Sequence, residues 1–512
     1  MSRICRALAA LSLLSSLVHT VSGAAIPPRE DTPIIARSAI AVKLDAATAA
    51  SLQSRNARTS PAQLIQDLIT KAAAGSTSDG KRSGVGSVKV APLFSSVSTD
   101  KLAGMVQQAV KNDPTYVPVD FGTWFQVQFP QSTEETSLDE IAKLLKKLGR
   151  NKEIASCQRL GMHRRQLPAA AQTAALKPND DPLYSKQGYL QGGGQGINAA
   201  YAWGFPGGDG AGTTVIDVER GWQLDHEDLV KANITLLSGQ NFKDRYGGNY
   251  PHGTAVLGEM LMVDNKIGGI GIVPNARGHV VGVQRTVNDG PVENPPDAIV
   301  DAASYLKVGD VMLLEMQTAD NDSALWPIEV EDAEFDAIRL ATAMGITVIE
   351  PAGNGDANGI GVNLDGPVVR LGDNSSHSFL NPKSKDFRDS GAILVGAGSA
   401  AYPRNRTVWS NYGSRVDVHA WGEHIWTSSV NVTDNYSDDY IEFDGTSGAA
   451  PIIAGAALSV QGMVYKNRGK KLSGADIRKL IKVGGTATIN GAADKIGVMP
   501  DLKALIDGGY LK

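Results

Sequence analysis

The sequence predicts an α/β fold: a three-layer domain with a mostly parallel sheet flanked by helices, preceded by a small α+β unit. Beyond Asn179, short apolar segments alternate with helical stretches, and strands separated by helices favour a parallel sheet that is covered on both faces. The chain of 512 residues is too long for one ordinary core, so we expect two or more folded units. Strands are predicted at 213–217, 310–316, 346–350 and 393–397, and helices at 254–262, 296–307, 330–344 and 447–463.

The small α+β unit is predicted near residues 115–162. Residues 124–129 alternate apolar and polar side chains as a strand does, and residues 153–160 form a further candidate strand. A capping box at Ser137 predicts a helix between them. The residues before 115 show only weak periodicity.

Residues 1–24 are typical of a signal peptide. Arginines give a basic start, residues 7–18 form an apolar run broken only by serines, and small residues lie near Ala24. The run is little more than half of the ~20 residues that a spanning helix needs, which disfavours the alternative of a membrane anchor. We find no later stretch apolar and long enough to span a bilayer. We therefore expect a secreted, extracellular protein with no membrane attachment after removal of the signal.

The composition excludes some classes of protein. A formal net charge of −5 is small for this length and argues against a nucleic-acid-binding protein. Of the two cysteines, Cys5 lies in the predicted signal peptide and Cys157 lies upstream of the long α/β region, so the mature part can form no intrachain disulfide. Stability must then come from a large core, bound ions or glycans. Asn-x-Ser/Thr sequences make candidate glycosylation sites of Asn233, Asn321, Asn374, Asn405, Asn431 and Asn435.

Four segments carry side chains with catalytic chemistry. An apolar strand ends in Asp217, at the kind of position where catalytic groups gather in α/β sheets, and His252 opens a helix beside Gly253. Ser447 begins an alanine-rich helix between small residues, which leaves its hydroxyl open and places free backbone N–H groups beside it. Asn354 lies on a glycine-flanked turn. Each residue alone also has an ordinary explanation, as a turn residue, a structural histidine or a helix N-cap.

In chain order, Asp217, His252, Asn354 and Ser447 resemble the subtilisin-like serine peptidases, or subtilases, which use the order Asp, His, Ser. The resemblance covers roughly residues 179–499 and rests on a His-Gly-Thr motif and a Gly-Thr-Ser-x-Ala-Ala-Pro motif. It implies a serine endopeptidase that hydrolyses peptide bonds through an acyl-enzyme intermediate. Ser447 would attack the carbonyl, His252 would take its proton and Asp217 would hold the imidazole. Asn354 and the Ser447 backbone N–H would bind the oxyanion.

The same resemblance implies a zymogen. Residues 25–165 look like the propeptide of the family, which assists folding and acts as an intramolecular inhibitor, and residues 179–512 would form the peptidase domain. The pair Arg164-Arg165 predicts a processing boundary, although a surface pair of arginines is usually only a solvated face. The expected partners are protein or peptide substrates and the propeptide, with no nucleic acid. We expect a monomer that needs no cofactor for its chemistry.

The first motif departs from the family pattern. Subtilases usually have Asp-Thr-Gly or Asp-Ser-Gly, whereas this chain has Asp217-Val218-Glu219. Val218 supplies no hydroxyl near the carboxylate, so the support of Asp217 must differ. We expect Glu219 to be a solvated loop residue.

Two strand ends are expected to bind the substrate through Glu315, Met316, Gln317, Glu350 and Gly353. Glu315 and Glu350 stand where the family usually has small uncharged residues. One hypothesis is that they form an acidic wall of the S1 pocket and favour Lys or Arg at P1. The alternative is that these carboxylates bond to each other or to backbone amides.

The resemblance also suggests a structural calcium site. The expected ligands are the side chains of Asp228 and Asn265 and the carbonyl oxygens of Val263, Ile267 and Gly269. A set of oxygen ligands suits Ca²⁺. As an alternative, Lys266 would replace the ion with its own charge.

Two rival functions remain. A catalytically inactive relative with the subtilase fold, acting as a binding protein, would have lost a member of the triad, and none is lost. A sedolisin-type carboxyl peptidase would have Glu in place of His252 and Asp in place of Asn354, and this chain has neither.

Overall fold

The computed structural model describes residues 39–53, 59–74, 88–129, 138–160, 176–243, 249–287, 290–320, 322–371, 375–434 and 436–512. These residues belong to one unit of the chain, 35–512. Outside the described residues lie the predicted signal peptide, the Arg164-Arg165 pair and the candidate glycosylation sites Asn321, Asn374 and Asn435.

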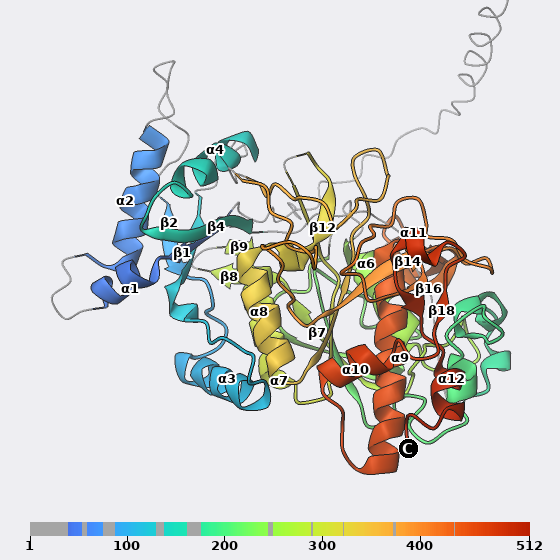
Figure 1. Cartoon of the computed structure of the whole chain (residues 1–512). Helices are drawn as coiled ribbons and strands as arrows, with labels where there is room; N and C mark the ends of the chain where they lie inside the picture. Colours follow the sequence, from blue (N-terminus) through green and yellow to red (C-terminus); the bar gives the residue numbers. More distant parts are fainter. Residues whose placement is uncertain are drawn as a thin grey trace, which may run out of the picture. The chain divides into compact units, whose positions relative to one another are not determined.

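The N-terminal region contains an antiparallel sheet with strand order β2-β3-β1-β4 (Figure 1). Its elements are β1 (Ala39–Leu44), α1 (Ala46–Leu52), α2 (Pro61–Ala74), β2 (Lys89–Pro92), α3 (Thr99–Asn112), β3 (Trp124–Gln128), α4 (Leu138–Leu148) and β4 (Ile154–Leu160). Strand β3, helix α4 and strand β4 lie where the sequence predicts them. Strand β1 is central in the sheet although it precedes residue 115, so the α+β unit begins earlier than we expected.

Strand β1 is buried on both faces because its side chains alternate between two hydrophobic clusters. Ile40, Val42 and Leu44 pack with residues of α2 and α4. Ala39 and Ala41 pack in a cluster that includes residues of α7 (Pro295–Tyr305) and α8 (Asp332–Ala343). Side chains on a strand point alternately to opposite faces, and the small alanines permit close packing on the side of α7 and α8.

The larger sheet has nine strands in the order β18-β19-β15-β14-β13-β10-β5-β7-β6. Neighbouring strands are parallel from β6 to β19, and β18 pairs antiparallel with β19. The predicted mostly parallel α/β sheet is confirmed. Its strands are β5 (Thr214–Glu219), β6 (Thr235–Ser238), β7 (Arg277–Gly282), β10 (Val311–Leu314), β13 (Thr347–Pro351), β14 (Ile393–Gly398), β15 (Val418–Trp421), β18 (Thr486–Ala487) and β19 (Val498–Met499).

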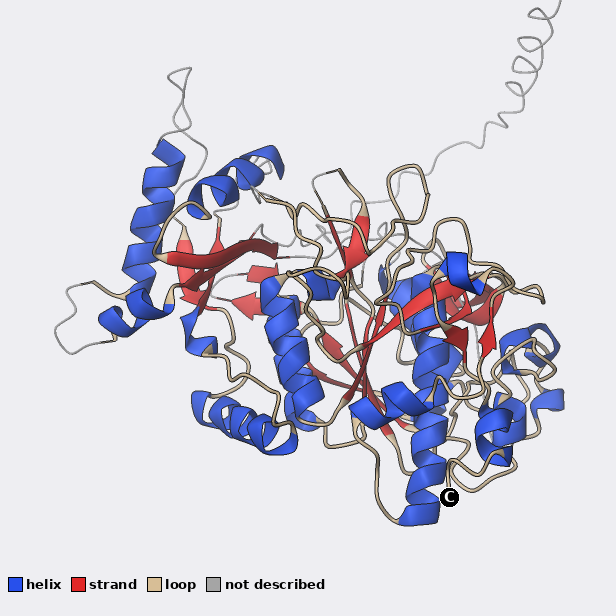
Figure 2. Ribbon diagram, in the orientation of Figure 1, coloured by secondary structure: helices blue, strands red, loops and turns tan. Residues whose placement is uncertain are grey.

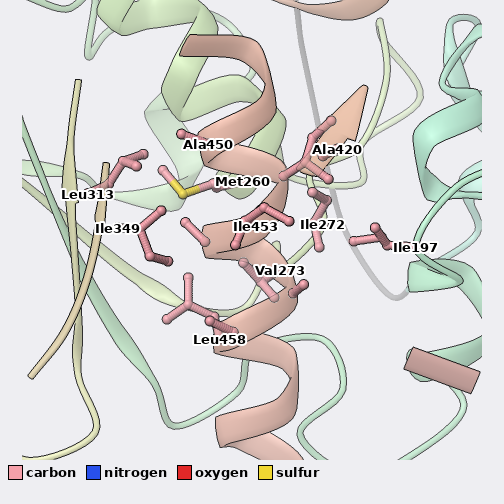
Figure 3. Close-up of a cluster of buried hydrophobic side chains, with 14 of the residues drawn as sticks. Ile197, Met260, Ile272, Val273, Leu313, Ile349, Ala420, Ala450, Ile453 and Leu458 are labelled. Carbon is pink, nitrogen blue, oxygen red and sulfur yellow. The ribbon is translucent and has the colours of Figure 1, made fainter. Parts of the chain in front are cut away.

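Helices cover both faces of this sheet (Figure 2). On one face, Leu313 of β10 and Ile349 of β13 pack in a cluster with α6 (Asn249–Leu261) and α9 (Thr446–Arg468), as Figure 3 shows. On the other face, Met312 of β10 and Val348 of β13 pack in a cluster with α7 and α8. Consecutive residues of one strand therefore belong to opposite cores, which explains why these strands are apolar throughout rather than alternating.

Helix α9 is the core helix that carries Ser447. It is long and apolar enough to cross a membrane by length and composition, which corrects our expectation that no later stretch would be. Of its most apolar window, 94% is buried inside the fold. A helix that is apolar on all sides and surrounded by protein is a core helix of a large domain.

Three two-stranded antiparallel ribbons and several short helices complete the described structure. The ribbons are β8 (Gln284–Val287) with β9 (Gly290–Glu293), β11 (Gln317–Ala319) with β12 (Leu325–Pro327), and β16 (Ile425–Asn431) with β17 (Ser437–Phe443). The short helices are α5 (Ala199–Ala202), α10 (Gly474–Leu480), α11 (Gly491–Asp494) and α12 (Leu502–Asp507). The β16–β17 ribbon is fixed to α6, because the hydroxyls of Thr427 and Ser428 donate to the carbonyls of Ala255 and Thr254.

Candidate active site

His252 lies near the start of α6, where its imidazole contacts a carboxylate at the end of β5. Nδ1 of His252 forms an ion pair with Oε1 of Glu219, and both residues are buried. Gly253 permits this approach, because a Cβ atom there would lie 2.8 Å from Oε2 of Glu219. A carboxylate on one ring nitrogen holds the ring orientation and leaves Nε2 as the base.

We expected this contact from Asp217, and the structure gives it to Glu219 instead. Asp217 lies two residues earlier on the same face of β5, where its Oδ2 accepts a hydrogen bond of 2.6 Å from Nε1 of Trp222. Burial, reinforced by the nearby carboxylate of Glu219, raises the pKa of Asp217 well above its usual range. Asp217 is therefore a buried partner of Trp222, and Glu219 is not a solvated loop residue.

The position of Gly221 in the sequence indicates that Glu219, and not Asp217, corresponds to the acid of the family motif. In the family motif, glycine follows the acid by two residues, and Glu219-Arg220-Gly221 keeps that spacing whereas Asp217-Val218-Glu219 does not. Gly221 is required sterically, because a Cβ atom there would lie 3.0 Å from the carbonyl carbon of Phe242.

Ser447 and Asn354 meet at the start of α9. Ser447 is the second residue of the helix, after Gly445 at φ 110° and Thr446. Oδ1 of Asn354 accepts hydrogen bonds from the backbone N–H of Thr446 at 2.9 Å and from its hydroxyl at 2.8 Å. These bonds orient the amide so that Nδ2 has no acceptor among the described residues. A free side-chain N–H₂ beside a helix N-terminus is the arrangement of donors that stabilises an oxyanion.

Glu315 follows strand β10 and is buried, with 3% of its surface exposed. Both of its carboxyl oxygens lie in the interior without a hydrogen-bond partner among the described residues. Burial raises the pKa of Glu315 well above its usual range, and the neighbouring carboxylates of Asp217 and Glu219 raise it further. Glu315 is therefore not an accessible acid in a pocket wall.

Glu350 belongs to a buried charge network with Glu329 and Arg415, which corrects the hypothesis of an acidic S1 wall. Its Oε2 accepts from the backbone N–H of Glu329 at 3.4 Å, as the backbone-amide alternative expects. Nε of Arg415 lies 3.0 Å from Glu329, and Nη1 of Arg415 lies 2.8 Å from Asp417. Glu350 is 0% exposed, so it is not available to a cationic P1 side chain.

The other predicted substrate residues divide between the site and the core. Oε1 of Gln317 accepts a 3.2 Å hydrogen bond from the backbone N–H of Asn354, so Gln317 supports the turn that carries the amide. Gly353, at φ 100°, lies on the same turn. Met316 is buried in the cluster that includes α7 and α8.

Four buried carboxyl groups lie in this part of the fold, where Asp217, Glu219 and Glu259 are charged neighbours of Glu315. Burial also raises the pKa of Glu259 well above its usual range. Within the described part of the chain, no hydrogen bond joins His252 to Ser447. Catalytic hydrogen bonds are often long in a free enzyme and tighten with substrate.

The expected calcium ligands lie in an environment that fits a cation. Both carboxylate oxygens of Asp228 and Oδ1 of Asn265 are buried without a hydrogen-bond partner. Burial raises the pKa of Asp228 to about 11, and it raises the pKa of Asp181 to about 7. Lys266 does not neutralise them, because its side chain is 72% exposed and lies 3.4 Å from Asp180. Orphaned, oxygen-only donors of this kind suit a hard cation.

A transition-metal site is not supported in the described residues, which contain no group of three or more His, Cys, Asp or Glu side chains arranged to hold a metal. Among the candidate glycosylation sites that are described, Asn233 and Asn405 are exposed. Asn431 is half-buried, and its Oδ1 accepts hydrogen bonds from the backbone N–H groups of Thr433 and Asp434.

When the chain is compared with known proteins, its sequence matches one family. The Subtilase family matches residues 225–483, about half of the chain. That match begins after Glu219, so the assignment of the acid rests on the geometry of this chain. Subtilisin DY of Bacillus licheniformis is 25% identical over 252 residues, which cover 49% of this chain and 77% of that protein.

Two further proteins show the extent of the similarity. The alkaline protease of Alkalihalobacillus alcalophilus is 27% identical over 291 residues, 56% of this chain and 62% of that protein, so the chain spans less than two thirds of its length. The crystal structure of the epidermin leader peptide processing serine protease from Staphylococcus aureus covers 93% of this chain and 100% of its own, with a TM-score of 0.52 and 14% identity. At that identity it shows the shared fold alone. This chain belongs to the subtilase family.

Proposed function

We propose that the protein is a secreted serine endopeptidase whose catalytic triad is Glu219, His252 and Ser447. The observation that carries the proposal is the contact between Glu219 and Nδ1 of His252 at the strand ends where Ser447 and Asn354 also lie. This is the chain order acid, His, Ser of the family, with glutamate as the acid.

The proposed reaction has two half-reactions. Oγ of Ser447 attacks the scissile carbonyl while its proton passes to Nε2 of His252, and Glu219 stabilises the imidazolium. Nδ2 of Asn354 and the Ser447 backbone N–H donate to the oxyanion. The C–N bond then breaks as the imidazolium gives its proton to the amine, which leaves the acyl-enzyme. In the second half-reaction, His252 takes a proton from a water molecule, which attacks the ester carbonyl. The ester C–O bond then breaks as the imidazolium gives its proton to Oγ of Ser447, which releases the acid product.

The N-terminal region supports a zymogen. Nζ of Lys43 lies 2.8 Å from Oδ2 of Asp336 on α8, and the hydroxyl of Ser156 donates to Asp332 at 2.6 Å. Nδ2 of Asn294, just before α7, donates to the carbonyl of Leu93 at 2.9 Å. A region that docks on α7 and α8 and continues toward Arg164-Arg165 is suited to act as a propeptide that is cleaved near that pair.

A structural Ca²⁺ is also proposed. Asp228 and Asn265 would hold it with side-chain oxygens, and Val263, Ile267 and Gly269 would add carbonyl oxygens. The ion would neutralise buried carboxylates and stabilise the loop, without a part in the chemistry.

The test is covalent labelling of the secreted protein with a fluorophosphonate, which reacts with an activated serine. We expect labelling of the processed chain, loss of labelling in Ser447→Ala, and N-terminal sequencing that places the new terminus close to Arg165. A fully processed chain that is neither labelled nor hydrolytic would support the rival function, an inactive binding protein.

A further inference from the structure

A cavity of about 450 Å³ lies at the edge of the large sheet that is opposite the candidate active site. Thr214, the first residue of β5, lines this cavity, whereas Glu219 is the last residue of the same strand. Tyr465, near the end of α9, also lines it, and α9 begins beside Ser447, roughly 27 Å away along the helix axis (Figure 1). The cavity is therefore separate from the candidate active site, and its volume is typical of a site for a small molecule.

The floor of the cavity is formed by two neighbouring strands. Thr214 and Ile216 of β5 pair with Arg277 and His279 of β7 in parallel register. Residues two apart on a strand point to the same face, so these four side chains lie together, and all four line the cavity. Leu306, which follows α7, is buried and adds a second apolar side chain to the lining. The floor thus combines apolar side chains with a cationic one.

The lining carries an excess of positive charge. Arg277, Lys307 and Lys471 line the cavity, and Asp310 is the one acid among the described residues of the lining. Asp310 is already engaged, because its Oδ1 lies 2.6 Å from Nζ of Lys471 and its Oδ2 accepts a hydrogen bond of 3.0 Å from the backbone N–H of Lys307. In the part of the chain that the structure describes, the side chains of Arg277 and Lys307 form no ion pair. Lys307 follows the C-terminal end of α7 and offsets part of its negative charge, while Arg277 lies on a strand, away from the helix ends. Two cations are therefore left without a carboxylate.

Further groups that can bind an anion surround the cavity. Tyr305 on α7 and Tyr465 on α9 are 47% and 41% exposed, and each can offer a hydroxyl group to a ligand. Nδ1 of His279 lies 2.5 Å from the hydroxyl oxygen of Thr235, which leaves Nε2 as the ring nitrogen for a ligand. Nζ of Lys101 on α3 lies 5.1 Å from the ring centroid of Tyr305 and brings another positive charge to this side.

We propose that this cavity binds a small phosphate monoester with a compact apolar or aromatic body. A phosphate monoester carries close to two negative charges at neutral pH, which matches the two cations that lack a carboxylate. The guanidinium of Arg277 presents a planar set of N–H groups that can bind two phosphate oxygens at once, and Lys307 adds a point charge. The apolar side chains of the floor then contact the body of the ligand. The inference goes beyond the proposed peptidase function and does not depend on it.

Isothermal titration calorimetry of the purified full chain tests the proposal with four probes: phenyl phosphate, inorganic phosphate, benzoate and phenol. We expect phenyl phosphate to bind at one site with a Kd below about 1 mM. Inorganic phosphate lacks the apolar body and benzoate carries a single charge, so each should bind at least about fivefold more weakly. Phenol, which has no charge at neutral pH, should give no measurable binding.

The variants Arg277→Gln and Lys307→Gln each remove one positive charge from the lining. Either change should weaken the binding of phenyl phosphate by about tenfold or more, because a charge-assisted contact is lost. The control is Lys479→Gln, which removes the same charge from α10, where the side chain is 80% exposed and does not line the cavity. Its affinity should equal that of the wild type, and thermal unfolding confirms that each variant is folded.

Four results would overturn the inference. They are no binding of phenyl phosphate at millimolar concentration, equal affinity for phenyl phosphate and benzoate or phenol, unchanged affinity in Arg277→Gln or Lys307→Gln, and an equal loss of affinity in Lys479→Gln. Because the measurement is binding, it decides the role of the cavity whether or not the protein is a peptidase.

Discussion

Nδ1 of His252 is held by the carboxylate of Glu219, and Asp217 two residues earlier is bonded to the indole of Trp222. The longer glutamate reaches the imidazole from the last residue of β5, while the aspartate lies deeper in the fold. The two acids therefore have different partners: Glu219 contacts the imidazole of His252, and Asp217 is a buried acceptor for the indole of Trp222. Trp222 also touches the catalytic helix, because a Cβ atom on Gly253 would lie 2.7 Å from its Cδ1.

The amide of Asn354 is the proposed side-chain donor to the oxyanion. Asn354→Ala should lower kcat by about 10²–10³, because the donor acts on charge that exists only in the transition state. KM should change little. Steady-state kinetics on a peptide substrate measures both constants. The control is Asn358→Ala, on the exposed part of the same loop. Asn411 is not a suitable control because its amide donates a structural hydrogen bond to the carbonyl of Ala352.

Gly253 is required for the approach of Glu219 to His252. In Gly253→Ala, the new methyl group would lie 2.7 Å from Cδ1 of Trp222, 2.8 Å from Oε2 of Glu219 and closer still to the backbone carbonyl oxygen of Gly221, so these neighbours must shift. We expect a loss of about 1–3 kcal/mol in the free energy of unfolding, as overpacking of a buried site usually costs. We also expect a fall in kcat larger than the loss of folded protein accounts for. Gly491→Ala in the peptidase domain, where a Cβ atom would meet nothing closer than 3.5 Å, is the control. An unchanged kcat in Gly253→Ala would show that Gly253 is not needed for the approach of Glu219.

Removal of calcium should destabilise the protein. The buried oxygens of Asp228 and Asn265 have no partner without an ion, and a ligand present at 100 times its Kd stabilises a fold by about 2.7 kcal/mol. EGTA should therefore lower the melting temperature, and excess Ca²⁺ should restore it. In Asp228→Asn the effect of EGTA should be much smaller. A melting temperature that does not respond to EGTA in the wild type would exclude a structural calcium ion.

The contact between the N-terminal region and α8 should weaken as pH rises. Glu334 bonds to Nε2 of Gln158 on β4, and burial, with the charge of Glu331, raises the pKa of Glu334 to about 8. A carboxyl group whose pKa is raised in the docked state binds its proton there and releases it when exposed. Its stabilisation is therefore present below its ordinary pKa and is lost as pH rises toward 8. In Ser447→Ala, which keeps the chain intact, thermal stability should fall from pH 5 to pH 8, and Glu334→Gln should reduce that slope. An equal slope in both proteins would rule out this role of Glu334.

The parallel sheet is predictable from the sequence because its strands are short apolar runs that face helices on both sides. The antiparallel β16–β17 ribbon was not predicted, since its second strand carries Ser437, Asp438 and Asp439 and resembles a loop. Strand β1 was not predicted either, because its alanines face α7 and α8 where larger side chains would not pack, and an alternation with alanine gives a weak signal.

Sequence reasoning predicted those residues of the site whose position is fixed by a local motif. His252, Asn354 and Ser447 lie on a helix start or a turn whose neighbouring residues specify the local backbone. Which acid reaches His252 depends on how far strand β5 continues. The local sequence alone does not decide between Asp217 and Glu219, which lie on one face of that strand. Glu315 and Glu350 lie at equivalent strand ends, but the groups around them, the acids Asp217 and Glu219 for Glu315 and the network of Glu329 and Arg415 for Glu350, are distant in sequence.

Glu219, and not Asp217, holds the imidazole of His252. The most direct test is kcat of Glu219→Gln and Asp217→Asn on one peptide substrate, with thermal unfolding to confirm that both are folded. Glu219→Gln should lower kcat by about 10³-fold or more, as loss of the triad acid does, with little change in KM. Asp217→Asn should keep most of the activity, because the Oδ1 of asparagine can still accept the hydrogen bond from Nε1 of Trp222 and Asp217 does not contact His252. A large loss in Asp217→Asn together with near-normal activity in Glu219→Gln would contradict the account.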